Sequence, residues 1–373
     1  MVANLAPGLH VERLWSRKAY LGVGGNGLHF DLTDVVVDGL MTGFFLCVGL
    51  EIRRELAVGT LRSARAAVAP VLCAIGGMVV PMIVYTIIAR HAGAAGGWAI
   101  PSATDVALAV GIAGLVAPGL SPGARAFLLT LAVADDLGGI AIIGVWYSHG
   151  IAVLPAAVAI CLAAVAAVVV HMGLVRLPVA LLLLLPAWML MRSAHIEPPI
   201  IGAVFGLLVP IGSTTRGNSV CLEVDALLRR LGPLVGLAVL PLFAVVSASV
   251  PISGEAIGSS VAVGVALGLC LGKPLGIFGA LWLFTKSGIA EHPQGSSARE
   301  LLGVSILGGV GFTVSLFIAR VGLSTDALQR SATFGVFVGS LLATAGGAAY
   351  FRSIRTLAPD LRYAPGIEEA PRR

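Results

Sequence analysis

Long apolar segments recur along nearly the whole chain and limit its fold more than any other feature. Each can cross the hydrocarbon core of a bilayer, which is about 30 Å thick and takes roughly 20 helical residues. Because lipid offers no partners to backbone N–H and C=O groups, such segments must be helical. We assign eleven of them, at residues 34–52, 66–89, 98–116, 123–147, 151–172, 174–191, 197–212, 232–250, 258–285, 301–321 and 328–351.

The composition leads to the same class of protein. Only 12% of the 373 residues are charged, about half of the roughly 25% found in soluble domains. We therefore expect an all-α polytopic membrane protein without a sizeable soluble domain. The net charge of +5 is spread over short loops, which excludes a nucleic-acid partner. The five cysteines show no metal-ligand spacing, and no cofactor is expected.

Hydropathy divides the chain into three parts. Residues 1–33 form an extramembrane segment, residues 34–351 a single transmembrane domain and residues 352–373 a tail. In the first part, the side chains of YLGVGGNGLHFDL alternate in character on both sides of Asn26-Gly27, a dipeptide typical of two-residue turns. We therefore predict a β-hairpin at about residues 19–31.

The loop charges orient the spans. With the arginine-rich loop 53–65 in the cytoplasm, most loop cations and the C-terminal tail lie inside, as the positive-inside rule requires. The outer loops between spans then hold only Arg90, Arg192, Arg320 and Arg330. This orientation leaves Arg13, Arg17 and Lys18 outside, so we expect that a further spanning helix precedes Met1.

Few charges fall within the apolar segments: the acids Asp38, Asp105, Asp135 and Asp136, Glu197 at a span edge, and the cation Lys273. An aspartate at a helix centre costs about 2.5–3.5 kcal/mol on insertion scales, so the tandem pair costs roughly 5–7 kcal/mol. A merely structural helix has no reason to accept that cost. The pair therefore predicts a functional site, with a hydrogen-bonded clamp between helices as the alternative.

The tandem aspartates cannot share one partner in the same way, because adjacent helical residues point about 100° apart. One can pair with Lys273 while the other faces an aqueous cavity. Burial and a nearby negative charge both make a carboxyl harder to ionise. Such a carboxyl can hold a proton or a small cation, and this competition is the chemistry of antiport.

Two segments carry interruptions at membrane depth. Pro101, Ser102 and Thr104 precede Asp105 in one, and the glycines of LGGVGFTVS lie within the other, residues 301–321. Paired broken helices are the best sequence indication of a transporter's binding site. Asp105 can neutralise the ends of the half-helices or bind an ion directly, and Thr104 can be a backbone cap or an ion ligand.

Several motifs occur here in a specific order and spacing: DGLMTGFFLCVGLEIRREL, WAIPSATDVALAVG, LTLAVADDLGGIAII, LPLFA, LGKPLGI and GGVGFTVSLFIA. With them, the chain resembles the NhaA-type sodium/proton antiporters over about residues 19–351. The resemblance implies twelve spans, inverted repeats with two crossed discontinuous helices, and a homodimer formed through a hairpin at residues 21–30. We assign eleven spans instead of twelve, because the family's first helix has no counterpart in this chain.

The resemblance also implies roles for individual residues. Asp136 is the principal carrier of Na⁺, Li⁺ and H⁺, with Asp135 beside it. Thr104 and Asp105 belong to the helix crossing, and Lys273 pairs with one of the two aspartates. The family's activity is electrogenic exchange of Na⁺ for H⁺ across the bacterial inner membrane, which regulates cytoplasmic pH and sodium.

At the cytoplasmic mouth, VGLEIRREL matches the segment linked in the family to activation by pH, with Glu51, Arg54 and Glu55. Without the resemblance, the same residues read as a solvated helix end with an ion-pair ladder.

Two departures weaken the expectation of the family's alkaline activation. Glu197 occupies the position of a family histidine, with His195 displaced by two residues, and Leu228 replaces a family glutamate.

Two other functions compete with antiport. Paired aspartates also serve intramembrane proteases, but there the two come from different helices so that both reach one peptide bond. An inactive or truncated antiporter homologue is the other alternative.

Overall fold

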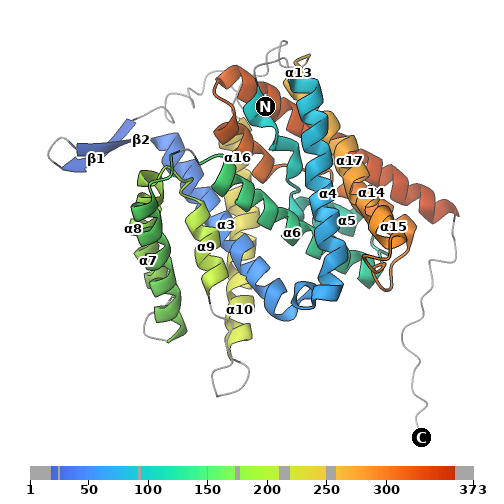
Figure 1. Cartoon of the computed structure of the whole chain (residues 1–373), viewed down its shortest axis with the longest axis horizontal. Helices are drawn as coiled ribbons and strands as arrows, with labels where there is room; N and C mark the ends of the chain where they lie inside the picture. The colour runs from blue at the N-terminus through green and yellow to red at the C-terminus, as the bar shows by residue number, and fades with distance from the viewer. Residues whose placement is uncertain are drawn as a thin grey trace, which may run out of the picture.

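The computed structural model describes residues 18–23, 26–90, 94–148, 150–172, 177–209, 219–248 and 258–357. These residues are almost entirely helical (Figure 1). The α-helices are α3 (Leu32–Val58), α4 (Ala64–Ala89), α5 (Val106–Val116), α6 (Pro122–Trp146), α7 (Val153–His171), α8 (Leu177–Ser193), α9 (Ile200–Leu208), α10 (Ser219–Leu234), α11 (Leu240–Ala248), α13 (Ser260–Leu267), α14 (Lys273–Lys286), α15 (Ala298–Leu307), α16 (Thr313–Gly322) and α17 (Asp326–Leu357).

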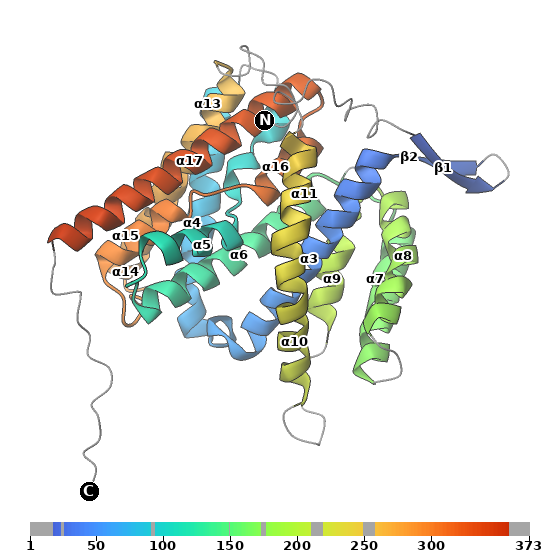
Figure 2. The same ribbon diagram turned by 180° about the vertical axis from the view of Figure 1, so that it is seen from behind.

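Short helical turns connect several of these elements. The 3₁₀ turns η1 (Thr60–Arg62), η2 (Ala95–Gly97) and η3 (Ile100–Ser102) lie in connections and interruptions. The π-helical turns η4 (Val235–Val239) and η5 (Gly268–Gly272) join α10 to α11 and α13 to α14, so that each pair runs on as one long helix. Figure 2 shows α10 and α11 in line.

Seven described segments are long and apolar enough to cross a membrane: Ala64–Ala89, Ala95–Val116, Pro122–Trp146, Val153–Val170, Leu227–Ser247, Ser260–Lys286 and Asp326–Ile354. The chain is therefore a multi-pass α-helical membrane protein, as the sequence predicts. The total of eleven spans stays a prediction. The domain limits at residues 34 and 351 also stay a prediction; the first long helix, α3, begins at Leu32, and the last, α17, ends at Leu357.

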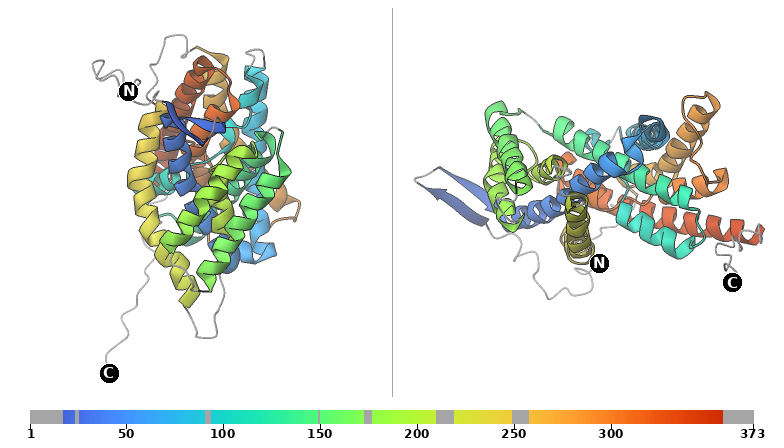
Figure 3. Two further views of the ribbon diagram at one scale, coloured as in Figure 1. Left: turned by 90° about the vertical axis from the view of Figure 1, so that its left-hand side faces the viewer. Right: turned by 90° about the horizontal axis from the view of Figure 1, so that it is seen from below.

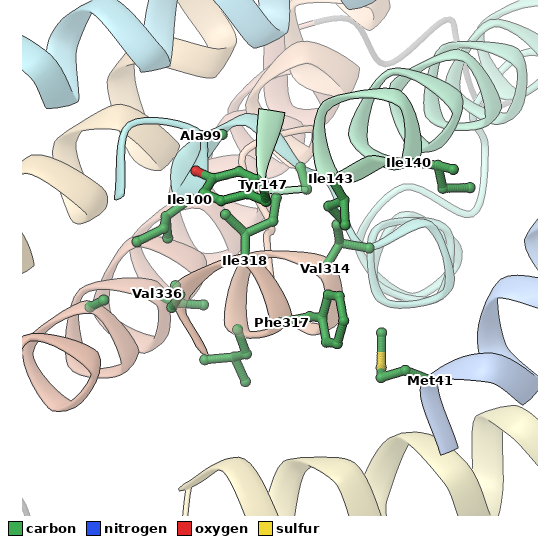
Figure 4. Packing of buried hydrophobic residues seen from close by; sticks show 14 of the residues in the cluster. Met41, Ala99, Ile100, Ile140, Ile143, Tyr147, Val314, Phe317, Ile318 and Val336 are labelled. Atoms are coloured by element: carbon green, nitrogen blue, oxygen red, sulfur yellow. The ribbon is translucent and has the colours of Figure 1, made fainter. Parts of the chain in front are cut away.

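The helices form two groups. One contains α3 with α7, α8, α9 and α10, and the other contains α4, α5, α6 and α13 to α17 (Figures 1 and 3). The two groups meet through apolar side chains of α3, α6 and α16. Phe45 of α3 packs edge-on against Phe317 of α16, with ring centroids 5.8 Å apart. In Figure 4, Met41 of α3 lies near the same ring, and Val314 of α16 faces Ile143 of α6.

A close helix crossing fixes the position of α14. A Cβ atom on Gly76 of α4 would lie 2.5 Å from the carbonyl oxygen of Gly276 in α14. The absence of side chains at both residues lets the backbones approach, as small residues commonly do between membrane helices. Lys273 is one turn from Gly276, so this crossing holds Lys273 in the interior.

The N-terminal strands β1 (Lys18–Val23) and β2 (Asn26–Asp31) pair in antiparallel register, with Lys18 opposite Asp31 and Val23 opposite Asn26. The predicted turn position is wrong, because Asn26 and Gly27 belong to β2. Residues 24 and 25, a Gly-Gly dipeptide, separate the strands and lie outside the described residues. Gly-Gly and Asn-Gly are both turn dipeptides, and the sequence pattern could not rank them.

Candidate functional site

Two interrupted helices meet in the interior. Residues 103–105 lie outside regular helix between η3 and α5, and residues 310–312 do so between α15 and α16. The backbone N–H of Asp105 donates to the carbonyl of Val310 at 2.8 Å, and Thr104 Oγ1 donates to the carbonyl of Gly308, also at 2.8 Å. Each interruption thus supplies partners to backbone groups that the other leaves unpaired.

Glycine makes this approach possible. A Cβ on Gly311 would lie 2.8 Å from the carbonyl oxygen of Ala103, and one on Gly309 would lie 2.4 Å from that of Leu269. Gly311 therefore permits contact between the two interruptions, and Gly309 permits contact between its interruption and η5.

Asp105 joins the starts of two half-helices. Its Oδ1 caps α5 by accepting from the N–H of Leu108 at 3.1 Å. Its Oδ2 accepts from the hydroxyl of Thr313, the first residue of α16, at 3.1 Å and from its N–H at 3.4 Å. Helix N-termini carry partial positive charge, so one carboxylate neutralises both. This contact set supports the neutralising role of Asp105 over that of a direct ion ligand.

Lys273 is fully buried (0% exposed) and forms an ion pair with Oδ2 of Asp135. Its ammonium also donates to Thr104 Oγ1. The N–H of Thr104 completes the cluster by donating to Asp135 Oδ2 at 2.8 Å. Thr104 therefore ties the ion pair to the crossing of the interrupted helices.

Asp136 occupies a different environment from its neighbour. Its side chain is 4% exposed, and within the described part of the chain no hydrogen bond to its carboxyl is present. The second oxygen of Asp135, Oδ1, is also buried without a hydrogen-bond partner among the described residues. Carboxylate oxygens are hard ligands that suit small cations.

Among the residues that the structure describes, no group of three or more His, Cys, Asp or Glu side chains could hold a metal ion.

The three mouth residues do not pair with one another as a ladder. Arg54 forms an ion pair with Asp225 of α10 at 2.6 Å. Oε1 of Glu55 accepts from the N–H of Thr60 at 2.7 Å and from the hydroxyl of Thr130 in α6 at 3.1 Å. Glu51 is partly buried on α3. Sequence reasoning missed Asp225 and Thr130, because no motif links them to residues so far away in the chain.

The remaining intramembrane acids lie elsewhere. Asp38 at the start of α3 pairs with Arg192 of α8 at 3.3 Å. The nearby hydroxyl of Thr42 accepts from the indole N–H of Trp188 at 3.1 Å. Glu197 is partly buried just before α9. Neither acid contributes to the cluster around Lys273.

Buried charges at interrupted membrane helices are typical of multi-pass transporters. The sequence pattern of the family described as "Na+/H+ antiporter 1" matches residues 1–351. The chain belongs to this family of transporters.

Individual relatives match over most of the chain. "Na(+)/H(+) antiporter NhaA 1" of Klebsiella pneumoniae is 36% identical over 350 residues, which cover 92% of this chain and 87% of the relative. "Na(+)/H(+) antiporter NhaA" of Rhodospirillum rubrum is 37% identical over 352 residues, covering 92% and 88%. "Na(+)/H(+) antiporter NhaA 2" of Frankia alni is 37% identical over 358 residues, covering 92% and 71%.

Proposed function

We propose that the chain is an electrogenic secondary transporter that exports Na⁺ or Li⁺ across the bacterial inner membrane in exchange for H⁺. In this role it regulates cytoplasmic pH and sodium. The observation that carries the proposal is the unequal pairing of the tandem aspartates. Asp135 is held by Lys273, whereas no hydrogen bond to the Asp136 carboxyl is present among the described residues. The sodium/proton specificity rests on family membership.

Asp136 carries the exchanged ion in this mechanism. When it is ionised, a small cation binds to its carboxylate and to the unpartnered oxygen of Asp135. When it is protonated, the negative charge that attracts the cation is gone. A site that holds either ion in turn, and opens to the two sides alternately, exchanges one for the other.

The electrogenic part of the proposal draws on the number of carboxylates in the site. Each of the two carboxylates can take up a proton, whereas the pair binds a single Na⁺. More protons than sodium ions then cross in one cycle, so charge moves with the exchange.

Thr104 and Asp105 position the site in this mechanism, and the Thr104 hydroxyl is a candidate cation ligand. Glu51, Arg54 and Glu55 are proposed to regulate transport, through contacts of α3 with α6 and α10 at the mouth. The N-terminal hairpin is proposed to join two copies into a homodimer, and the C-terminus to face the cytoplasm.

Transport in everted membrane vesicles tests the proposal. An acid-trapped fluorescent dye is quenched when respiration acidifies the interior, and adding Na⁺ or Li⁺ should relieve the quenching. Asp136→Asn should abolish the response, whereas Asp326→Asn, which alters an exposed acid at the start of α17, should not. If the unaltered chain gives no response at acidic, neutral or alkaline pH, the proposal is wrong.

A further inference from the structure

A groove of about 380 Å³ lies where α4 and α6 end, and no residue of the carboxylate cluster lines it. Its lining comes from the end of α4, from η2 and the residue that follows it, and from the end of α6. The side chains that shape it are Tyr85, Thr86, Arg90, Ala95, Trp98 and Trp146. We call it the Arg90 groove.

Three membrane-crossing segments place the Arg90 groove at the level of a membrane–water interface. Ala64–Ala89 ends at it, Ala95–Val116 begins at it, and Pro122–Trp146 ends at it. Tryptophan and tyrosine are enriched at this depth, where an amphipathic ring meets both the headgroups and the apolar core. The rings in the groove are therefore at the depth of lipid headgroups.

The aromatic wall is preformed. Trp98 packs edge-on against Trp146 with centroids 5.4 Å apart and stacks on Tyr147 at 6.4 Å. The hydroxyl of Tyr85 donates to the carbonyl of Ala94 at 2.9 Å, which holds the start of η2 against α4. A ligand would find this wall already in place.

Apolar surface continues from the groove toward the membrane core. Ile83 and Ile87 precede Arg90 on α4 by seven and three residues, so all three share one face of the helix. Ile87 is 64% exposed and Ile83 is 52% exposed. The rim residue Trp146 is 63% exposed. Arg90, in the wall of the groove, thus stands at the end of an apolar track formed by Ile87 and Ile83 on the same helix face.

Arg90 is one of few cations on its side of the membrane. In the orientation that the loop charges predict, the outer loops between spans hold only Arg90, Arg192, Arg320 and Arg330. A cation directly after α4 also offsets the negative end of that helix. That role alone would need neither the aromatic wall nor the apolar track.

We propose that the Arg90 groove binds a phospholipid of the leaflet in which α4 ends. The guanidinium contacts the phosphodiester, the Trp98 and Trp146 rings pack against the glycerol region, and an acyl chain follows Ile87 and Ile83. Arginine is well suited to phosphate because its planar fork donates two parallel hydrogen bonds. A free anion would meet one exposed cation and gain nothing from the apolar track, so the intact lipid is favoured.

The proposal is tested on the full chain purified in a maltoside detergent. A phospholipid with a photoactivatable group in its acyl chain is added, and labelled peptides are mapped by mass spectrometry. Labelling should concentrate on α4 around Ile83–Ile87 and on the end of α6. Native mass spectrometry of the same samples measures how much phospholipid stays bound.

Three variants separate the lipid site from other effects. Arg90→Gln should weaken the binding of phospholipid about tenfold, the usual loss for a charge-assisted hydrogen bond. Arg90→Lys should retain part of this binding. Ala95→Trp leaves Arg90 in place but fills the groove, and it should also remove labelling. Arg330→Gln is the matched control, because it removes the same charge on the same side without touching the groove.

Several outcomes would overturn the proposal. Retention and labelling unchanged in both Arg90→Gln and Ala95→Trp would show that lipid does not use the groove. Equal competition by inorganic phosphate or by acyl-free glycerophosphodiester would show a simple anion site. Protection of the groove in a purified dimer that carries no phospholipid would assign this surface to a second copy of the chain.

Discussion

Lys273 forms its ion pair with Asp135 and not with the neighbouring Asp136. The choice is made by the helix crossing, since the N–H of Thr104 donates to the same oxygen of Asp135 that receives the ammonium. Two adjacent acids thereby acquire different chemistry. Asp135 is paired with an ammonium group, whereas no such partner of Asp136 is present among the described residues.

Lys273→Ala should destabilise the protein strongly, because it leaves Asp135 buried and without its counterion. Removing one partner of a buried pair typically costs about 3–5 kcal/mol. The measurement is the thermal unfolding temperature of the purified protein in detergent. The double variant Asp135→Asn with Lys273→Gln should recover most of the loss, because no buried charge is left unpaired. An equally low temperature in the double variant would contradict this account.

Thr104→Val should lower the unfolding temperature, since the change removes the acceptor for Lys273 and the donor for Gly308. Leaving buried polar groups unsatisfied costs about 1–3 kcal/mol. Thr104→Ser keeps the hydroxyl and should stay close to the unaltered protein. If Ser and Val variants lose the same stability, the effect comes from packing and not from the hydroxyl.

Gly309→Ala should disturb the packing of the 310–312 interruption against η5, because its Cβ would lie 2.4 Å from the carbonyl oxygen of Leu269. Overpacking of this kind costs about 1–3 kcal/mol. Gly279→Ala in α14 is the control, since a Cβ there meets nothing within 4 Å. The unfolding temperature of Gly309→Ala should be the lower of the two. Equal unfolding temperatures would mean that the backbone at Gly309 can move away from η5 at no cost.

Glu300 should stabilise the protein in a pH-dependent way. Its carboxylate accepts from the N–H of Ser121 and from the N–H of Ser297, both at 2.8 Å, tying α15 to the start of α6. Partial burial raises the pKa of Glu300, but the hydrogen bonds from Ser297 and Ser121 outweigh it and lower the pKa overall.

The sign of the pH effect follows from the lowered pKa of Glu300. Its contribution is complete above the ordinary glutamate pKa of about 4.3 and is lost as the pH falls through the lower folded value. Glu300→Gln should therefore unfold at a lower temperature than the unaltered protein at neutral pH, and the gap should close in acid. A gap of the same size at both pH values would contradict the ionic role.

Much of this site could be predicted from the sequence because charge in an apolar segment is rare and costly. Asp135, Asp136 and Lys273 stand out for that reason, and the Pro and Gly interruptions mark the backbone that surrounds them. Hydropathy likewise identifies the membrane class. The partner of Lys273 could not be chosen from sequence, since the two aspartates are equivalent in pattern and differ only through the contact with Thr104.

Other features depend on contacts that no local pattern encodes. Asp225 reaches Arg54 from a helix far along the chain, one turn before Leu228, the residue that replaces the family glutamate. The Arg90 groove arises where three segment ends come together. The position of the hairpin turn was wrong because two glycine-containing dipeptides compete within a few residues.

The central claim is that Na⁺ and H⁺ compete for the carboxylate of Asp136, and calorimetric titration of the purified protein with Na⁺ at several pH values tests it most directly. The account predicts that the apparent Kd rises about tenfold per unit of acidification for each proton displaced, that binding releases protons, and that Asp136→Asn binds no Na⁺. An affinity for Na⁺ that does not change with pH, or that survives in Asp136→Asn, would contradict it.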